Sequence, residues 1–425
     1  MTLKTLSIRK KSGEPFIVEG PSSVHVISGE VSSLGASFHP GSSVVIPEFK
    51  SMPFIVEEDC ELEVKLPDES RLIPTQEYLP GEWVELAGRL EGAEGCFKVV
   101  VLGDTDSGKS TLTTFLANRL ICKGRRVAVV DADTGQKNLG PPTTIGMKVL
   151  VKPTPILSEE AEDSAFFIGS TSPAGLIDRS VAGVLFLVSE ALKGGAEVIL
   201  IDTTGWIYGS EARELKTLMV TSLKPEFLIA IQRSGELEPL IKPFIKTSIQ
   251  VIRVPAPKNI RRRSRSERKA LRSRVFRRYL RGGRMVNLSM DDAGILYSFT
   301  GSGRLPDKDR MDMIQKVLGE RPLYCEEAGD SILLVLGESA NIEDAKLKVV
   351  RYKAFDKEVK VLKENDFKNV LCGLIDAECR FLGLGVIEKV DFKSRKLRIY
   401  TKVEESRIAA IQVGSMKVTQ EGAEE

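Results

Sequence analysis

The spacing of hydrophobic residues divides the chain into three stretches with different periodicities. In residues 1–92, short apolar segments alternate with polar positions and are interrupted by Gly, Pro and Ser-Ser pairs, which predicts β-strands. The clearest segments are Phe16–Val18, Val24–Ile27, Ser43–Ile46 and Cys60–Val64. This stretch shows no convincing helical periodicity, so we expect a small β-sandwich or barrel.

From Cys96 to about Met285, continuous apolar runs alternate with longer helical segments. Such runs are typical of strands in a parallel sheet that is covered on both faces. The predicted strands are Val99–Leu102, Val127–Val130, Ala165–Ile168, Val198–Ile201, Leu228–Ile231 and Ile249–Val254. The predicted helices lie near Ser110–Cys122, Asp178–Leu192, Ser210–Thr221 and Gly235–Ile245. This alternation predicts an α/β domain with a doubly wound, mostly parallel sheet.

After Asn287 the pattern returns to short strands, with one helix expected at Asp307–Leu318. The strands are predicted at Ile332–Leu336, Val350–Ala354, Leu371–Ile375, Gly385–Val390, Lys396–Tyr400 and Ala410–Val413. We therefore predict an N-terminal β domain at residues 1–92, a central α/β domain at 93–286 and a C-terminal mostly-β domain at 287–425.

Composition narrows the class of protein without identifying it. The 425 residues are 42% hydrophobic and 28% charged, which is typical of a soluble protein with two or three domains. No apolar run reaches the roughly 18–20 residues that a membrane helix needs, and the N-terminal residues do not read as a secretory signal. Six scattered cysteines and two histidines predict no zinc site. We expect a cytoplasmic protein that binds no membrane.

The strongest motif directly follows the first apolar run of the central domain. Residues Gly103–Thr111 read G-x-x-x-x-G-K-[ST] between a predicted strand and a predicted helix, as in P-loop NTPases. The glycines let the backbone curl around an anion, and the helix N-terminus adds a positive dipole end. We expect Lys109 to reach the β- and γ-phosphates of ATP and Ser110 to hold Mg²⁺. The whole predicted loop is Gly103, Asp104, Thr105, Asp106, Ser107, Gly108, Lys109, Ser110 and Thr111.

Acidic residues end two further strands. Asp131 and Asp133 follow the run Val127–Val130, and Asp202 follows Val198–Ile201. In open parallel sheets, ligands bind outside the carboxyl ends of the strands. We expect Asp133 to orient an acceptor hydroxyl or take its proton, and Asp131 to bind a metal-ligated water, so that both lie at the metal with Ser110. The alternative for either acid is a simple end to the strand or a loop cap.

The segment after the second of these strands reads Asp202-Thr-Thr-Gly205-Trp206. It is similar to the γ-phosphate sensor of GTPases and partition ATPases, with Asp202 in the metal shell and the amide of Gly205 near the γ-phosphate. Trp206 is one of two tryptophans in the chain. We expect it to face the crevice, where it could stack on a base, although packing in the core is the alternative.

The net charge of +2 hides a basic segment. Between Lys258 and Arg284 there are thirteen Lys or Arg residues and one acid, Glu267, so the rest of the chain sums to about −10. Apolar residues at helical spacing predict an amphipathic helix from about Ser264. We expect a basic lid at 258–284 whose arginines close over a triphosphate or bind the phosphates of an acceptor; a solvated basic face is the alternative.

Together these motifs resemble the polynucleotide 5′-hydroxyl kinase family, which includes an ATP-binding subunit of the mRNA 3′-end cleavage machinery, a ribosomal-RNA processing kinase and archaeal RNA/DNA kinases. The resemblance covers essentially the full length of the chain. One departure is Leu280 after Tyr279, where many members carry an aromatic residue. The matching pieces are Gly103–Thr111, Asp131-x-Asp133-x-Gly-Gln136, Pro141-Pro-Thr-Thr, Phe167-Ile-Gly169-Ser-Thr-Ser-Pro173, Thr203-x-Gly205-Trp206 and the basic lid that ends in Tyr279-Leu280.

The resemblance implies transfer of the γ-phosphate of ATP to the 5′-hydroxyl of RNA or DNA in RNA processing, with other RNA-processing proteins among the expected partners. It implies that Gln136, Thr203 and Trp206 contact the nucleic acid. The family's lid arginines have the spacing of Arg263, Arg268 and Arg272. Its catalytic positions correspond to Lys109 and Asp133.

Two other functions stay open at this stage. One is a non-catalytic ATP-binding scaffold in an RNA-processing complex, because the family includes members that bind without turnover. The other is a GTPase or assembly ATPase. The chain lacks the N-K-x-D motif that recognises guanine, which counts against GTP as the nucleotide. High charge and few histidines also suggest an archaeal or thermophilic source.

Overall fold

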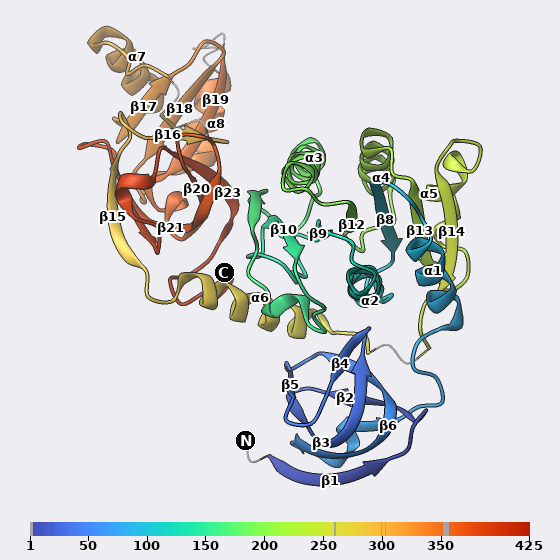
Figure 1. The fold of residues 1–425 in the computed structure, drawn as a ribbon. Coiled ribbons are helices and arrows are strands. Elements are labelled where there is room, and N and C mark those ends of the chain that lie inside the picture. The colour runs from blue at the N-terminus through green and yellow to red at the C-terminus, as the bar shows by residue number, and fades with distance from the viewer. Residues whose placement is uncertain (1–2, 259–260, 299, 302, 352–356) are drawn as a thin grey trace. The chain divides into compact units, whose positions relative to one another are not determined.

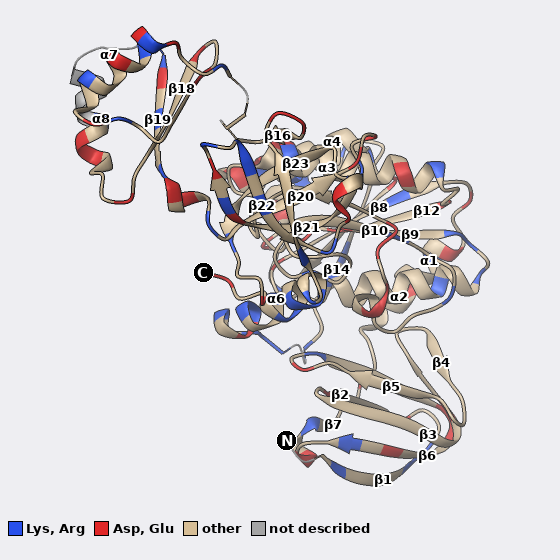
Figure 2. Cartoon of the chain, turned by 90° about the vertical axis from the view of Figure 1, so that its left-hand side faces the viewer, with Lys and Arg blue, Asp and Glu red and all other residues tan. Residues whose placement is uncertain are grey.

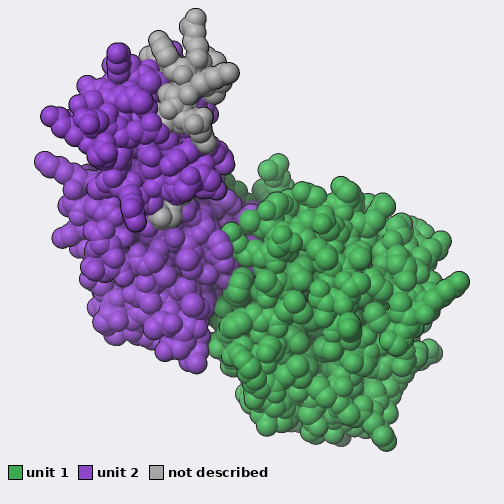
Figure 3. Space-filling model, turned by 90° about the horizontal axis from the view of Figure 1, so that it is seen from above, with its two compact units in different colours: residues 1–140, 144–166, 172–271 green, residues 141–143, 167–171, 272–425 purple. Residues whose placement is uncertain are grey.

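The computed structural model describes the chain except for residues 1–2, 259–260, 299, 302 and 352–356. The chain forms two compact units, shown in separate colours in Figure 3. The first unit comprises residues 1–140, 144–166 and 172–271, and the second comprises 141–143, 167–171 and 272–425. The structure is α/β with several sheets, in agreement with the predicted class. Within the described residues, no helix has the length and apolar character that a membrane span requires.

The first unit begins with a seven-stranded antiparallel sheet built around one long strand, β6. Strands β1, β2 and β3 all pair with β6. Alternate side chains of β6 are buried, and Phe54 stacks on Phe16 of β2 with ring centroids 5.1 Å apart. The strands are β1 (Lys4–Lys10), β2 (Pro15–Glu19), β3 (Ser22–Ser33), β4 (Ala36–Phe38), β5 (Ser43–Ile46), β6 (Ser51–Leu66) and β7 (Leu72–Pro74), and they confirm the four predicted here.

A second seven-stranded sheet follows, in the order β11-β10-β9-β12-β8-β13-β14. Neighbouring strands from β9 to β14 run parallel, whereas β10, which the sequence analysis missed, is antiparallel to β9. The strands are β8 (Phe97–Gly103), β9 (Val127–Asp131), β10 (Thr144–Leu150), β11 (Ser164–Phe167), β12 (Val198–Asp202), β13 (Phe227–Gln232) and β14 (Gln250–Pro255). Because β8, β9 and β12 are neighbouring parallel strands, their carboxyl ends meet at one edge.

Helices cover both faces of this sheet, α1 and α2 on one side and α3 and α4 on the other (Figure 1). The helices are α1 (Gly81–Glu91), α2 (Lys109–Cys122), α3 (Ile177–Lys193), α4 (Ser210–Leu223) and the short α5 (Glu238–Ile241). Helix α1 contradicts the expectation that residues 1–92 lack helices. Its buried residues recur at helical spacing and pack into the core of the central sheet; they are Trp83, Leu86, Ala87 and Leu90.

Helix α6 (Arg265–Leu280), dense in Lys and Arg (Figure 2), begins in the first unit and ends in the second. The second unit contains a six-stranded and a three-stranded sheet. Their strands are β15 (Arg284–Ser289), β16 (Gly294–Leu296), β20 (Val370–Ile375), β21 (Phe381–Asp391), β22 (Lys396–Thr401) and β23 (Ala410–Lys417), and β17 (Tyr324–Glu327), β18 (Ser331–Leu336) and β19 (Glu358–Lys363). Five 3₁₀ turns complete the described elements: Glu69–Arg71, Leu157–Glu159, Lys242–Phe244, Glu364–Phe367 and Glu405–Arg407.

Two helices accompany the three-stranded sheet. Helix α7 (Lys308–Leu318) confirms the one predicted there, whereas α8 (Ile342–Arg351) was not expected. Val350, the first residue of a predicted strand, lies in α8 instead, and the rest of that strand falls mainly on residues outside the described part of the chain.

Asn118 of α2 connects three segments of the first unit. Its amide nitrogen donates to the carbonyl oxygens of Leu34 and Thr154, at 2.7 and 2.8 Å, and its Oδ1 accepts from the backbone N–H of Thr154 at 2.8 Å. The side chain is fully buried. The hydrogen bonds therefore hold the turn after β3 and the segment after β10 against the helix that follows the phosphate loop.

We expect Asn118→Ala to destabilise the protein, because it leaves interior backbone groups without their partner. At about 1–3 kcal/mol for each buried group left unsatisfied, the free energy of unfolding should fall by about 2–4 kcal/mol in chemical denaturation. Cys122→Ser, at an exposed position of the same helix, is the control and should change it by less than about 0.5 kcal/mol. A loss for Asn118→Ala no larger than the control's would contradict this role.

Candidate functional site

The loop between β8 and α2 is shaped to hold an anion. Gly108, at the N-cap of α2, has a φ of +96°, and a side chain at Gly103 would collide with Ser107, so the backbone curls tightly at both glycines. Lys109 is buried and its Nζ donates to the carbonyl oxygen of Asp104 at 2.7 Å. The first amides of α2 and the positive end of its dipole can bind phosphate oxygens at the same place.

Ser110 and Asp202 form the pair at which a divalent cation fits. The hydroxyl of Ser110 donates to Oδ2 of Asp202 at 2.6 Å. Oδ1 of Asp202 is buried and has no hydrogen-bond partner among the described residues. Burial raises the pKa of Asp202 to about 7; the charge of Asp131 acts in the same direction and that of Lys109 opposes it. A carboxylate oxygen without a partner beside a hydroxyl suits Mg²⁺, which completes its shell with phosphate oxygens and waters.

The carboxylate of Asp131 is occupied within the protein. Its oxygens accept from the backbone N–H groups of Asp133 (3.0 Å), Asn138 (2.6 Å) and Leu139 (3.0 Å), and Nζ of Lys137 lies 3.3 Å from Oδ1. Both members of this ion pair are buried, with side chains 1% exposed. Asp131 is therefore positioned to shape the loop after β9, and its geometry does not support the expected role at the metal.

Asp133 is partly exposed and differently bonded. Its Oδ1 accepts from the backbone N–H groups of Gly135 and Gln136, both at 2.9 Å. All hydrogen bonds described for this carboxylate use Oδ1, so its orientation is fixed while Oδ2 can face a ligand. The charge of Asp133 acts to raise the pKa of Lys109 and that of Asp202.

The residues after β12 do not share one role. Thr203 is fully buried, and its hydroxyl donates to the carbonyl oxygen of Val101 at 2.8 Å, which locks the end of β12 to β8. Because no part of Thr203 reaches the surface, the structure does not support the expected contact with nucleic acid. Trp206 is half-buried at the loop, and its backbone N–H donates to the hydroxyl of Thr204 at 3.3 Å.

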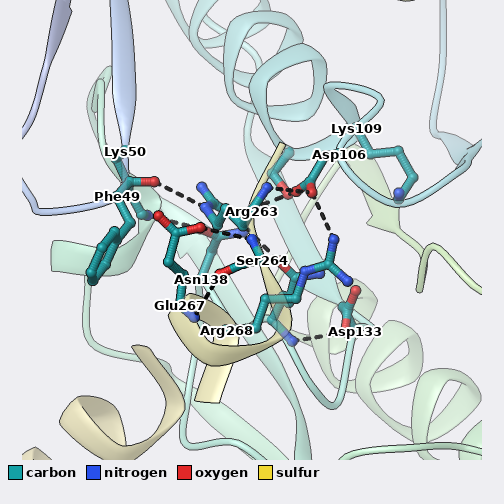
Figure 4. A network of polar contacts seen from close by, with 12 residues as sticks. Phe49, Lys50, Asp106, Lys109, Asp133, Asn138, Arg263, Ser264, Glu267 and Arg268 are labelled. Carbon is teal, nitrogen blue, oxygen red and sulfur yellow. Dashed lines mark hydrogen bonds and ion pairs between the residues drawn. The ribbon is translucent and has the colours of Figure 1, made fainter. Parts of the chain in front are cut away.

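Two lid arginines contact the phosphate loop. Figure 4 shows Arg263 and Arg268 directed at the carboxylate of Asp106. Arg268 donates to Oδ2 at 2.8 Å, the backbone N–H of Arg263 donates to the same oxygen at 3.1 Å, and the Arg263 guanidinium lies 3.8 Å from Oδ1. Arg263 also donates to the carbonyl oxygen of Phe49, in the N-terminal sheet region, at 2.9 Å and to Oε1 of Gln136 at 3.3 Å.

The charges around Arg263 and Arg272 differ. Burial lowers the pKa of Arg263, and the charge of Asp106 opposes that shift. Arg272 belongs to the second unit, where its guanidinium donates to both carboxylate oxygens of Glu424 at 2.5 and 2.8 Å. The structure thus brings Arg263 and Arg268 onto the same carboxylate of the phosphate loop, whereas Arg272 is paired with an acid near the C-terminus.

Sequence reasoning missed Lys216, a buried cation on α4. It is 1% exposed, and its Nζ donates to the carbonyl oxygen of Thr204 at 2.6 Å. Burial lowers the pKa of Lys216 to about 7; the charge of Lys109 acts in the same direction, while the charges of Asp133 and Asp202 oppose it. A signal was available in the sequence, because this lysine occupies the apolar face of a predicted helix among Ala212, Leu215, Met219 and Val220.

Comparison with known proteins identifies the family and the fold of the chain. A family profile described as mRNA cleavage and polyadenylation factor CLP1 P-loop matches residues 103–282. A solved structure of a wild-type Clp1p–Pcf11p complex contains a chain with the same fold, at a TM-score of 0.65 and 13% identity, with coverage of 97% of this chain and 98% of that one.

Curated relatives extend the match across most of the sequence. The polyribonucleotide 5′-hydroxyl-kinase of Pyrococcus abyssi is 32% identical over 340 residues, which are 79% of this chain and 92% of that protein. The protein of the same name from Thermococcus kodakarensis is 33% identical over 349 residues, 81% of this chain and 95% of that one. By this similarity and by its phosphate loop, the chain belongs to the polynucleotide 5′-hydroxyl kinase family.

Proposed function

We propose that this protein transfers the γ-phosphate of ATP to the 5′-hydroxyl of a polyribonucleotide. The observation that carries the proposal is the contact of the Arg263 and Arg268 guanidinium groups with Asp106, at 3.8 and 2.8 Å, since it brings two cations onto the phosphate loop. The kinase name of the archaeal relatives supports the reaction and the choice of RNA as acceptor. DNA acceptors and other RNA-processing proteins as partners stay predictions.

In this proposal the phosphate loop holds the triphosphate at the carboxyl ends of β8, β9 and β12, as doubly wound folds hold their ligands. The curl of Gly103–Thr111 and the start of α2 supply the amides, and Lys109 adds a charge. Ser110 and Asp202 would hold Mg²⁺, which would neutralise phosphate charge when it is bound. All these binding groups belong to the central domain. Helix α1 also packs into the core of that domain.

Asp133 accepts the proton of the acceptor. The 5′-oxygen of the RNA forms a bond to the γ-phosphorus, the bond from that phosphorus to the bridging oxygen breaks, and ADP leaves with the electron pair. The hydroxyl proton passes to the carboxylate of Asp133, whose Oδ1 is fixed by two backbone N–H groups. Trp206, half-buried at the loop after β12, stacks on a base of the acceptor. Gln136, whose Oε1 accepts from the guanidinium of Arg263, contacts the acceptor beside the lid.

The lid arginines stabilise the transferring group. In the structure the carboxylate of Asp106 accepts a hydrogen bond from the Arg268 guanidinium, and the Arg263 guanidinium lies 3.8 Å from it. When ATP is bound, the oxygens of the γ-phosphate offer more negative charge within reach of the same guanidinium groups. We infer that Arg263 and Arg268 exchange the carboxylate for the phosphate and neutralise its charge in the transition state.

We expect Asp133→Asn to reduce phosphate transfer by roughly 10²–10⁴-fold, because the amide cannot take the proton. The assay is the appearance of label on a 5′-hydroxyl oligoribonucleotide incubated with γ-labelled ATP, together with a separate measurement of ATP binding, which should hardly change. Asp312→Asn, at an exposed position of α7, is the matched control. Transfer at the wild-type rate by Asp133→Asn would refute the assignment, and free phosphate without labelled RNA from the wild type would indicate an ATPase.

We expect Arg268→Ala to lower kcat by about 10³-fold, the lower end of the effect of an arginine that neutralises a transferring phosphate. Arg265→Ala removes an exposed arginine one turn earlier on α6 and should leave kcat unchanged. Steady-state kinetics of labelled transfer for both variants makes the comparison. Equal kcat values for the two variants would mean that Arg268 contributes only general positive charge.

A further inference from the structure

Lys216 lies where a helix of this kind normally buries an apolar side chain. Its neighbours on the buried face of α4 are Ala212, Leu215, Met219, Val220 and Leu223. A cation in such a place costs several kcal/mol unless partners compensate it. The hydrogen bond described for its ammonium group goes to a neutral backbone oxygen, that of Thr204. Packing alone does not require a cation here, because an apolar residue of similar length would fill the same space.

The loop that Lys216 holds is fixed to the phosphate loop at three further points. Asp202 accepts from Ser110 at 2.6 Å, and Thr203 donates to Val101 of β8 at 2.8 Å. Gly205 packs directly on Thr105, because a Cβ at Gly205 would lie only 2.6–2.7 Å from atoms of that threonine. Asp202, Thr203 and Gly205 thus contact β8 or the phosphate loop, and Lys216 holds the residue between them, Thr204.

We propose that Lys216 is a positioning residue for phosphoryl transfer, which fixes the 202–205 loop against the phosphate loop by holding the carbonyl oxygen of Thr204. The inference rests on the proposed kinase function of the same site. The ammonium group has three N–H donors, of which one is used for Thr204. Because Thr204 directly precedes Gly205, the bond that Lys216 donates also restrains the Gly205 amide.

The positive charge of Lys216 is opposite to that of a bound triphosphate. The charges of Lys109, Asp133 and Asp202 all influence the pKa of Lys216, so it shares their electrostatic environment. A bound triphosphate adds negative charge to that environment and favours the ammonium form. The hydrogen bond to Thr204 is then charge-assisted, which makes it roughly twice as strong as a neutral one at the moment when the loop must be rigid.

The test compares Lys216→Met and Lys216→Gln with Arg213→Met, which removes an exposed cation from the same helix. We expect Lys216→Met to lower kcat by about 10–100-fold, as expected for displaced reacting groups, with the dissociation constant of ATP within about threefold of the wild type. Its thermal unfolding temperature should stay close to that of the wild type, because removing a buried cation offsets the loss of the hydrogen bond to Thr204. Lys216→Gln keeps a donor and should recover part of kcat, and Arg213→Met should behave as the wild type.

A Lys216→Met protein that folds and has a kcat within twofold of the wild type would overturn the proposal, as would a loss of ATP binding in parallel with kcat. Wild-type kcat in Lys216→Gln would overturn the role of the charge, because the amide keeps only a neutral donor, and this test holds even where Lys216→Met does not fold. Failure of the kinase function itself is distinguishable, because the wild type would then bind ATP without labelling the oligoribonucleotide.

Discussion

Charge compensation at the carboxyl ends of three parallel strands is the constraint on which this site depends. Strands β8, β9 and β12 end side by side, and the groups gathered there, Lys109, Asp131, Asp202 and Lys216, are almost fully buried. Charges in the interior are tolerated when each is matched. Asp131 is matched by Lys137 and by backbone N–H groups, whereas Asp202 keeps one oxygen without a partner among the described residues. This oxygen of Asp202 lies where the triphosphate and its cation are expected.

Charges are also compensated where the lid contacts the phosphate loop. Asp106 is an acid within a loop whose amides suit an anion, and its side chain is only 7% exposed. Its carboxylate accepts hydrogen bonds from Arg263 and Arg268, and Arg263 in turn reaches Phe49 and Gln136. One carboxylate thus keeps the arginines near their place of action. In the proposed mechanism a phosphate takes over the same donors, so nucleotide binding and the position of the lid would be coupled.

Much of this arrangement was predictable because its signals are local. The phosphate loop depends on glycines at fixed spacing, and the buried strands read as continuous apolar runs, so both were found in the sequence. Side-chain assignments depend on the fold and were less accessible. Asp131 and Asp133 look alike in the sequence, yet one is bonded internally and the other is partly exposed. Thr203 is buried, and the apolar face of α4 marks Lys216 as unusual without showing its contact with Thr204, twelve residues away.

The most direct measurement is a crystal structure of the protein with a non-hydrolysable ATP analogue, Mg²⁺ and a 5′-hydroxyl oligoribonucleotide. The account predicts that the 5′-oxygen lies within hydrogen-bond distance of the Asp133 carboxylate and that Arg268 has left Asp106 for the γ-phosphate. A complex with both substrates bound in which Asp133 faces away from the 5′-oxygen, or in which Arg268 still pairs with Asp106, would contradict it.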